Sequence, residues 1–391
     1  KGNNIGNVDT TITSTQTLTL YSAGYDQFGN YIDDIDTTVW TSGGTLLPTP
    51  PTTFPDTTDV FTFDPDSVGS GKIFLSASGV QGDSTGLITV NPGVLSSLKI
   101  QTDSLDVNSE VGNLSFAAGQ DTTLFAVGYD LENNRIGVIN SDWTMNDTSL
   151  GVFDNGQPAI NNTGEVIFTA EEVGSGVITA TAVSNSSVSD QTGVFTVDVG
   201  TPVSITIRSA ANNSGFAYRD TALTISADTS LSLFAAAYDA FGNFTGDTPV
   251  NWGSDNLSGI PTATTSSIVF NPTQIDTGQI YTQSALTDDT TGTITVVAGA
   301  LAKIRIQSTA GATGSEVESI NLTAGEDTAL YAGGYDSDDN FISLISSNWT
   351  LEGDPIGTLV NPNPATNNVL SSDSVGSAVV RATQVAAPNF T

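Results

Sequence analysis

A tyrosine-aspartate pair followed by a tryptophan recurs four times along the chain. Each tryptophan lies 14 or 15 residues after the tyrosine, and these are the only tryptophans in the sequence. The sets are Tyr25-Asp26 with Trp40, Tyr129-Asp130 with Trp143, Tyr238-Asp239 with Trp252, and Tyr335-Asp336 with Trp349. This spacing indicates a unit of roughly 100 residues copied in tandem. It predicts an array of small domains and excludes one large domain.

One copy, residues 118–199, shows the local pattern of a β protein. The run from Asp121 to Tyr129 is rich in β-branched and aromatic residues, and Leu131 to Asn134 then supply turn residues. Further short apolar runs follow, separated by Gly, Asn, Asp and Ser. Several short strands at this spacing indicate a sandwich or barrel, and no window shows a helical period. We therefore expect an all-β fold with minimal helix.

Short motifs mark the same points in several copies. In each copy a short motif precedes the equivalent apolar strand. The motifs are Val68-Gly-Ser-Gly71, Val173-Gly-Ser-Gly176 and Val375-Gly-Ser-Ala378, and the third copy has Asp276-Thr-Gly-Gln279 instead. The first three copies close on Thr85-Gly-Leu-Ile-Thr-Val90, Thr192-Gly-Val-Phe-Thr-Val197 and Thr291-Gly-Thr-Ile-Thr-Val296. The later copies open on Leu98-Lys-Ile100, Ile205-Thr-Ile207 and Ile304-Arg-Ile306. The linkers between closing and opening strands are only a few residues long, which predicts a fairly stiff array.

The copies are of two alternating types. The second and fourth share Ala118-Gly-Gln-Asp-Thr122 and Ala324-Gly-Glu-Asp-Thr328, whereas the first and third share Phe28-Gly-Asn30 and Phe241-Gly-Asn243. The true period is therefore a pair of units, and the chain is an ABAB array. We name the expected domains A1 (residues 1–92), B1 (93–199), A2 (200–298) and B2 (299–391).

The composition narrows the chemistry. With 42 acidic against 9 basic residues and a net charge of -33, the chain repels nucleic acid and anionic lipid, and we expect neither as a partner. It has no histidine and no cysteine, so it lacks the commonest general base, a thiol nucleophile, the usual zinc ligands and any disulfide. No membrane span or signal peptide is evident. We expect no enzyme, no bound cofactor and no membrane insertion.

The third copy carries the pattern most plainly. Tyr238-Asp-Ala-Phe-Gly-Asn243, then Pro249-Val-Asn-Trp252, and a closing Thr-Gly-x-Ile-Thr-Val strand resemble bacterial immunoglobulin-like repeats. Those are the tandem domains of invasin- and intimin-type adhesins and of very large bacterial cell-surface or extracellular fibre proteins. The resemblance covers essentially the whole chain. It implies a tandem array of immunoglobulin-like β-sandwich domains at the cell surface or outside the cell, and it specifies a fold and not a ligand.

The outer repeats lack parts that the inner ones contain. A1 has no counterpart to the opening strand at Leu98 to Gln101, and B2 has no closing Thr-Gly-x-Ile-Thr-Val strand. The favoured interpretation is a window cut from a longer repeating polypeptide. The alternative is a subunit whose ends are completed by strands from neighbouring copies, since an unpaired sheet edge invites strand addition.

Each copy also carries an Asp-x-x-x-Asn element whose oxygens could bind calcium. The elements are Asp26 with Asn30, Asp130 with Asn134, Asp239 with Asn243, and Asp336 with Asn340 beside Asp338 and Asp339. Calcium takes six to eight oxygen ligands, so two side chains in one turn are too few. A hairpin turn stabilised by these side chains is the favoured interpretation. Ca²⁺ held between units stays open.

The repeated aromatic residues are predicted to be structural. One tryptophan at a fixed position in each unit is typical of a sandwich core, and a carbohydrate-stacking platform is the disfavoured alternative. The predicted core set is Trp40, Trp143, Trp252, Trp349, Tyr25, Tyr129, Tyr238 and Tyr335. The acidic pairs Asp33-Asp34, Glu171-Glu172 and Asp288-Asp289 could imitate a glycosidase acid and base, but solvated loop charge explains them better.

A tripeptide of Asp, then Ser or Thr, then a small or apolar residue is similar to a bacterial O-glycosylation signal. It occurs more often than the composition alone predicts, although the repeats inflate the number. The candidate acceptors are Thr10, Thr37, Thr57, Ser67, Ser84, Ser104, Thr122, Thr221, Thr290, Thr328 and Ser374. The competing interpretation is that Asp-Ser and Asp-Thr begin strands and turns. Asn-x-Ser/Thr sites, at Asn113 or Asn348 for example, are weaker signals.

Two classes of function compete. The first is the structural repeat region of a secreted or cell-surface fibre, filament or adhesin stalk, which could be polymeric and glycosylated. The second is a module that binds surface glycans or a receptor. A spacer between catalytic domains is a third reading. The structural class leads because the copies share no cluster of exposed aromatics, and its expected partners are other copies or neighbouring repeats.

Overall fold

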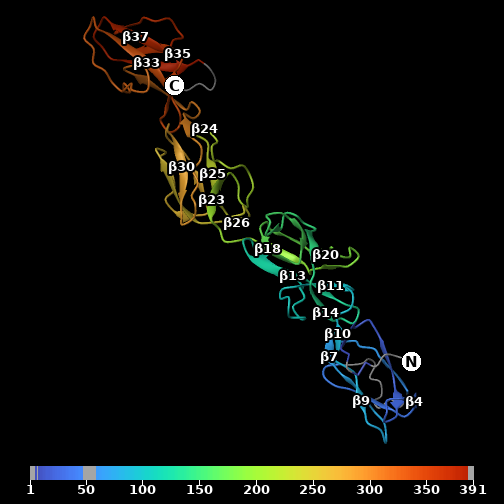
Figure 1. Ribbon diagram of the computed structural model, residues 1–391. Coiled ribbons are helices and arrows are strands. Elements are labelled where there is room, and N and C mark those ends of the chain that lie inside the picture. Colours follow the sequence, from blue (N-terminus) through green and yellow to red (C-terminus); the bar gives the residue numbers. More distant parts are fainter. Residues whose placement is uncertain (1–4, 7, 47–58, 386–391) are drawn as a thin grey trace. The chain divides into compact units, whose positions relative to one another are not determined.

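The structure is a computed structural model that describes residues 5–6, 8–46 and 59–385. In these residues the chain forms strands β1 to β38 and no helix, so none that could cross a membrane (Figure 1). The all-β prediction is therefore confirmed. Two compact units are distinguished, residues 1–200 and 201–391, and their division coincides with the end of the first AB pair.

Each repeat is a set of short, mainly antiparallel strands, and A1, B1 and A2 each also contain one parallel pair of named strands. A1 holds β1 Thr10–Thr13, β2 Leu18–Tyr21, β3 Ala23–Tyr25, β4 Tyr31–Asp34, β5 Val39–Ser42, β6 Val60–Phe63, β7 Gly69–Gly71, β8 Ile73–Ser76, β9 Asp83–Ser84 and β10 Ile88–Asn91. B1 holds β11 Ser97–Gln101, β12 Leu114–Ala117, β13 Asp121–Tyr129, β14 Arg135–Val138, β15 Ser141–Met145, β16 Gly151–Phe153, β17 Ala159–Thr163, β18 Glu165–Ala170, β19 Gly174–Gly176, β20 Ile178–Ala182, β21 Ser189–Gln191 and β22 Phe195–Asp198. A2 holds β23 Ser204–Arg208, β24 Leu223–Ser226, β25 Leu231–Tyr238, β26 Phe244–Asp247, β27 Val250–Asp255, β28 Thr264–Thr265, β29 Ser267–Phe270, β30 Thr277–Gln283 and β31 Ile294–Val297. B2 holds β32 Lys303–Gln307, β33 Asp327–Tyr335, β34 Phe341–Leu344, β35 Ser347–Gly353, β36 Gly357–Leu359, β37 Asn367–Ser372 and β38 Ala378–Gln384.

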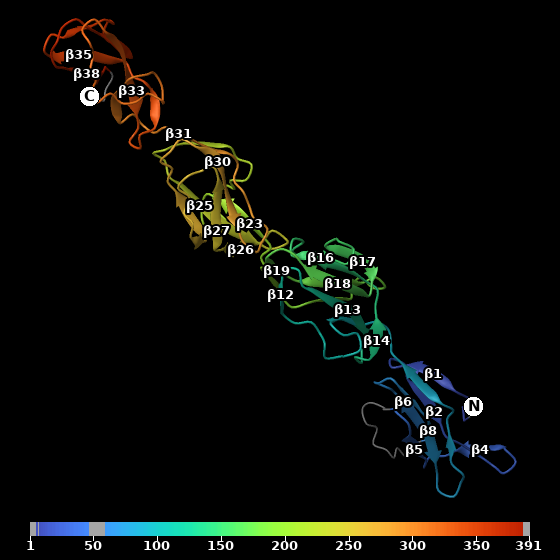
Figure 2. The same ribbon diagram turned by 90° about the vertical axis from the view of Figure 1, so that its left-hand side faces the viewer.

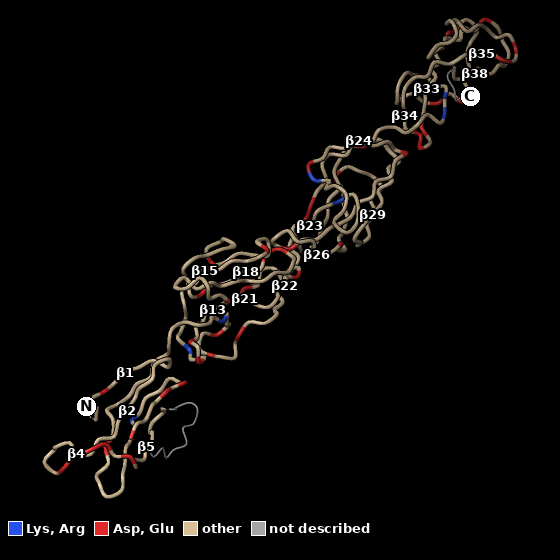
Figure 3. Tube along the Cα trace, turned by 90° about the vertical axis from the view of Figure 1, so that its right-hand side faces the viewer, with Lys and Arg blue, Asp and Glu red and all other residues tan. Residues whose placement is uncertain are grey.

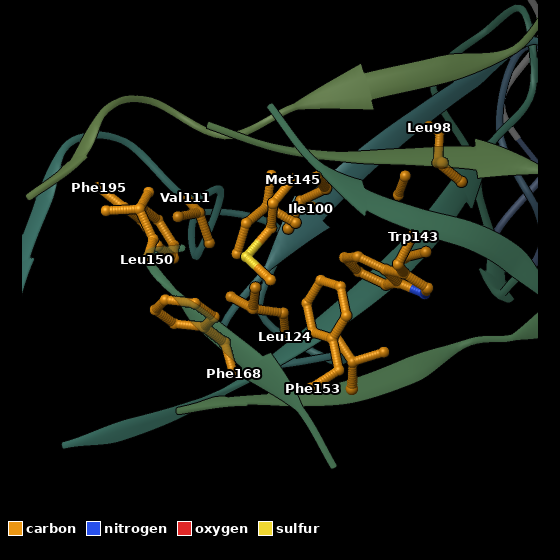
Figure 4. Close-up of a cluster of buried hydrophobic side chains, with 14 of the residues drawn as sticks. Leu98, Ile100, Val111, Leu124, Trp143, Met145, Leu150, Phe153, Phe168 and Phe195 are labelled. Atoms are coloured by element: carbon orange, nitrogen blue, oxygen red, sulfur yellow. The ribbon is translucent and has the colours of Figure 1, made fainter. Parts of the chain in front are cut away.

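B1 is the most complete repeat and is an immunoglobulin-like sandwich. One sheet has the order β11-β13-β18-β16 with β14 beside β13, and the facing layer consists of β17-β15-β20-β21 and β12-β22-β19 (Figure 2). Burial alternates along β20, as expected for strands with one face in a core. Trp143 and Phe168 lie in that core (Figure 4). The other repeats each have their own separate cluster of buried apolar residues.

The Thr-Gly of the closing motif is explained by two close contacts. The threonine hydroxyl is buried and accepts the backbone N–H of the strand behind it, at 3.0 Å in Thr85, Thr192 and Thr291. The following glycine meets another segment of backbone. A Cβ on Gly193 would lie 2.4 Å from the carbonyl carbon of Gly112. In A1, B1 and A2 the motif therefore packs the closing strand against a segment near the start of the repeat.

One sequence alignment is wrong by a residue. In the ladder, Gly71 pairs with Ile88 and Gly278 pairs with Ile294, so the A2 counterpart of Val68-Gly-Ser-Gly71 is Ile275-Asp-Thr-Gly278 and not Asp276 to Gln279. The reason is steric. A Cβ at either glycine would lie within 2 Å of a carbonyl oxygen, 1.8 Å at Gly71 and 1.9 Å at Gly278. In A1 and A2 this position therefore has no room for a side chain, whereas B2 has Ala378 there.

A1 differs from the other repeats at its sheet edge. In B1, β11 pairs with residues 125–129 of β13, and Tyr129 is 2% exposed. Among the described residues of A1, no strand takes the part of β11 beside β3, and the equivalent Tyr25 is 57% exposed. The assignment of Tyr25 to the core is therefore wrong, because the strand that covers its ring elsewhere is not present there.

Gly193→Ala tests the close approach that seals B1. The new methyl group would meet backbone that cannot rotate away, so we expect the free energy of unfolding of B1 to fall by about 1–3 kcal/mol. Hydrogen exchange of the β22 amides measures this. Gly112→Ala is the matched control, because its Cβ would meet no heavy atom within 4 Å. Equal exchange rates in the two variants would contradict the explanation.

Candidate functional site

The four Asp-x-x-x-Asn elements are the same hairpin turn. In each, the asparagine N–H donates to the aspartate Oδ1 at 2.7–2.9 Å, and the asparagine Nδ2 donates to Oδ2 at 2.8–3.0 Å. The residue before the asparagine has a positive φ and is Gly29, Asn133, Gly242 or Asp339. Glycine, Asn and Asp are the residues that tolerate this conformation. The hydrogen bonds within the turn therefore explain why each element has an aspartate, in agreement with the favoured interpretation of a hairpin turn.

In the B repeats the same asparagine also reaches the preceding A repeat. Asn134 donates from Nδ2 to the carbonyl of Asp66 at 2.8 Å and accepts the N–H of Val68 at 3.2 Å. Asn340 does the same in the second unit, with the carbonyl of Thr273 at 3.1 Å and the N–H of Ile275 at 3.3 Å. We call these paired hydrogen bonds the amide clamp.

The loop that the amide clamp holds occupies the same place in both A repeats. It comprises residues 66–69 in A1 and 273–276 in A2, and we call it the trailing loop. It leads into the strand, β7 or β30, that pairs with the closing strand of the repeat. Two separately folded junctions therefore use one geometry, with different side chains in the loop.

The turn aspartate binds the linker between the two repeats. Asp130 Oδ2 accepts the hydroxyl of Ser14 at 2.6 Å and the N–H of Gly93 at 2.8 Å. Asp336 Oδ2 accepts the N–H of Gly299 at 2.8 Å, and Asp228 accepts the next N–H, that of Ala300, at 2.6 Å. The turn carboxylate thus satisfies the linker backbone in both units.

The linker glycines allow this close approach. A Cβ on Gly93 would lie 2.8 Å from the Thr15 methyl carbon, and one on Gly299 would lie 2.3 Å from Asp228 Oδ2. Asp130 and Asp336 are buried, at 2% and 0% exposed. The junctions are consequently tight enough to exclude water from two carboxylates.

Both buried carboxylates stay ionised. Burial alone would raise the pKa of Asp130, but the hydrogen bonds from Ser14, Gly93 and Asn134 together hold that pKa below its usual value. For Asp336, burial again opposes hydrogen bonds from Asn340, Gly299 and Asp338, and the net pKa is lowered. Donors aimed at a carboxylate favour its charged form.

Two further aspartates, the half-buried Asp190 and the buried Asp289, hold the opening strands. The N–H of Ile100 donates to Asp190 Oδ2 at 2.7 Å, and the N–H of Ile207 donates to Asp289 Oδ2 at 2.8 Å. Asp289 is 3% exposed and also pairs with Arg219 at 2.7 Å. The expectation that Asp288-Asp289 is solvated loop charge is therefore wrong for Asp289. Burial raises the pKa of Asp190 and outweighs the hydrogen bond from Ile100 and the nearby charge of Lys99, which lower it.

The remaining predicted residues fall into clear groups. The four tryptophans are buried, Tyr335 is 7% exposed and Tyr238 is half-buried. Among the candidate acceptors, Thr37, Thr221, Thr290 and Ser374 are exposed, and Thr10, Ser67, Ser84, Ser104, Thr122 and Thr328 are half-buried. Thr57 lies outside the described residues. The Ser67 hydroxyl is buried in the trailing loop without a hydrogen-bond partner.

No metal cluster is visible in the part of the chain that the structure describes. There, no group of three or more acidic side chains is placed to hold a metal ion. Acidic residues occur throughout both units and basic ones are few (Figure 3). Composition gives no sign of the junction between repeats. The one signal available in the sequence is the glycine in each linker, Gly93 or Gly299.

Comparisons with known proteins add a likeness of fold. No protein-family model and no curated protein matches the chain. FdeC, an adhesin of Escherichia coli, is 13% identical, with 76% of this chain and 97% of that chain covered and a TM-score of 0.33. Invasin, a bacterial integrin-binding protein, is 14% identical, with 96% and 79% covered and a TM-score of 0.33. Protocadherin γB7 domains EC3-6 are 13% identical, with 98% and 95% covered and a TM-score of 0.36.

Acidification tests the ionised state of Asp130. Because its folded pKa lies below the unfolded value of about 3.9, it contributes stability above that pH, and the contribution is lost as pH falls through the folded pKa. The Gly93 amide NMR shift should titrate with a midpoint below 3.9. Asp130→Asn should abolish the titration. A midpoint above 3.9 would show that burial outweighs the hydrogen bonds.

Proposed function

We propose that the chain is the structural repeat region of a cell-surface or extracellular stalk, in which each AB pair acts as one stiff element. The observation that carries the proposal is the amide clamp, present with the same geometry at both A-to-B junctions. A recognition loop would vary between copies according to its ligand. Here the feature that recurs joins one domain to the next.

The energetics of the junction favour stiffness. Asn134 alone contributes two hydrogen bonds to A1, and Asp130 contributes two more to Ser14 and Gly93. Each such bond stabilises by about 0.5–1.5 kcal/mol, and those to the charged carboxylate lie at or above the upper end. Several of them within one short linker restrict hinge motion strongly, which suits a part whose task is to hold other parts at a distance.

A second candidate is a glycan- or receptor-binding module, and one observation favours it. A1 exposes Tyr21, Tyr25, Phe28 and Tyr31 on neighbouring segments, with the rings of Tyr25 and Tyr31 in edge contact at 6.1 Å. Exposed aromatic rings stack on sugars and anchor protein interfaces. In A2 the equivalent Tyr238 is half-buried and Phe241 is 39% exposed, so this face is most open in A1.

Loss of the amide clamp should let A1 and B1 move independently without unfolding either repeat. In Asn134→Ala combined with Gly93→Ala, residual dipolar couplings from A1 and B1 should report two different alignments, whereas the unchanged chain should give one. Asn30→Ala is the matched control, because it removes the same bond within the A1 turn and leaves the junction intact. Independent alignment of A1 and B1 in the unchanged chain would overturn the stiff-element proposal.

Surface location is tested in the producing organism. Antibodies raised against A2 should label intact cells or shed fibres, and protease added to whole cells should remove the label. Labelling that requires broken cells would contradict the stalk.

If glycans are attached at the Asp-Ser/Thr sites, we expect them on the acceptor side chains that are exposed. We expect glycopeptide mapping of native material to find modification at Thr37, Thr221, Thr290 or Ser374, and none at Ser67, whose hydroxyl is buried at the A1–B1 junction. Unmodified masses at all four exposed sites would reject the glycosylation proposal. Modification at Ser67 would contradict the junction as described.

A further inference from the structure

A2 contains a polar groove beside Tyr238, the tyrosine of its Tyr-Asp pair. The groove measures about 520 Å³, and every residue that lines it belongs to A2. That volume falls within the range of about 300–1,000 Å³ that sites for small organic ligands occupy. The polar part of the lining includes Ser204, Thr206, Arg208, Asn213, Arg219 and Thr287. These side chains come from β23, from the segment that follows it and from the loop after β30.

The Arg208 guanidinium in this groove is half-buried and has neutral partners. Its Nε donates to the carbonyl of Ser214 at 3.2 Å, its Nη2 to the carbonyl of Gly215 at 2.7 Å, and its Nη1 to the Tyr238 hydroxyl at 3.4 Å. These bonds use three of its five N–H donors and leave two. In the part of the chain that the structure describes, no acidic side chain forms a salt bridge with Arg208. A charge taken partly out of water is costly without a counter-charge, and this one occurs in a chain with 42 acidic and 9 basic residues.

The B repeats show that the fold does not require this charge. The strand pairing places Gln101 of B1 and Gln307 of B2 at the position of Arg208. Both glutamines are 0% exposed, and each holds the loop that follows its strand. Gln101 Nε2 donates to the carbonyl of Asp106 at 3.1 Å, and Gln307 Nε2 donates to that of Gly314 at 2.8 Å. A neutral amide thus does the structural task, so the charge of Arg208 is available for another one.

Arg219 and three hydroxyl groups add further hydrogen-bonding groups to the groove. Arg219 uses Nε to pair with Asp289 Oδ1 at 2.7 Å, and its side chain is 54% exposed. Among the described residues, its Nη groups make no hydrogen bond, and neither do the hydroxyls of Ser204, Thr206 and Thr287. The groove therefore presents guanidinium and hydroxyl groups together.

Asp239 is acidic and also lines the groove, but its oxygens are already occupied. It is 4% exposed. Its Oδ1 accepts the N–H groups of Phe241 and Asn243, and its Oδ2 accepts Nδ2 of Asn243, each at 2.9 Å. Asp289 is likewise paired with Arg219. The acidic groups beside the groove have partners of their own, so they do not neutralise Arg208.

We propose that this groove binds a saccharide that carries a carboxylate, of the uronic or sialic acid type. The Arg208 guanidinium supplies the counter-charge, since arginine and carboxylate groups pair through parallel N–H···O bonds. The hydroxyls of Ser204, Thr206 and Thr287 exchange hydrogen bonds with those of the sugar ring. An inorganic anion would satisfy the charge but leave most of the groove to water. The proposal goes beyond the stalk, because it gives one repeat a ligand and does not require stiff junctions.

Arginine side-chain NMR on the whole 391-residue chain tests the site, because the sequence has only five arginines. Sialyllactose and a galacturonate trimer are the acidic probes, and lactose and the methyl-esterified trimer are their neutral counterparts. We expect at least one acidic probe to shift the Arg208 Nε–H signal in a saturable way. Its neutral counterpart should bind about tenfold more weakly, because it lacks the charge-assisted hydrogen bonds.

Arg208→Gln is the main variant, and we expect it to fold because B1 and B2 have glutamine at this position. The affinity for the acidic probe, measured by calorimetry, should fall about tenfold. Thr206→Val removes one hydroxyl at similar volume and should lower the affinity about threefold. Arg305→Gln is the matched control, because that guanidinium is already paired with Glu316 at 3.3 Å, and it should leave the affinity unchanged. Far-ultraviolet circular dichroism verifies the fold of each variant.

Equal affinities for an acidic probe and its neutral counterpart, or an unchanged affinity in Arg208→Gln, would overturn the proposal. So would the absence of a saturable shift with both acidic probes. Tighter binding of a short peptide with a free carboxyl terminus than of either acidic sugar would overturn it in favour of a peptide site. None of these outcomes bears on the coupled motion of A1 and B1, so the stalk and the saccharide site are judged separately.

Discussion

One aspartate and one asparagine, four residues apart, close a hairpin and also connect two domains. The carboxylate satisfies the turn backbone with one oxygen and the linker backbone with the other in Asp130. The amide of Asn134 bonds to the carboxylate and to the preceding repeat. Folding of the turn therefore prepares the junction, because the same groups are already oriented before the two repeats meet. The stiffness that we propose for each AB pair depends on this double use.

The sequence predicts the fold class well because the repeat supplies its own comparison. Four copies with fixed tryptophans, turn residues and alternating strands leave few alternatives to a sandwich, and residues such as Trp143 are buried as a core requires. The exact strand register is less predictable. In the sequence, Asp276 aligns with the valine of the Val-Gly-Ser motif. The strand pairing instead places Gly278 at the position of the last residue of that motif, where a Cβ would not fit in A2.

The junction could be predicted only in part. The Asp-x-x-x-Asn spacing identifies a turn, but the second partner of Asn134 is a backbone carbonyl and N–H in another repeat, and backbone groups leave no mark on the sequence. Burial is equally hidden. Asp289 reads as loop charge, yet it is enclosed and paired with Arg219. Tyr25 reads as core, yet it is exposed, because its environment depends on a strand beyond its own segment.

The parallel pairing of strands in A1, B1 and A2 has a mechanical consequence. In B1, β12 runs parallel to the closing strand β22, and in A2, β24 runs parallel to β31. Tension transmitted along the chain would pull the two members of such a pair in opposite directions along their own axes. The hydrogen bonds between them would then be loaded together in shear, and not opened one after another from an end. A repeat of this kind resists stretching until all the hydrogen bonds between the two parallel strands break together.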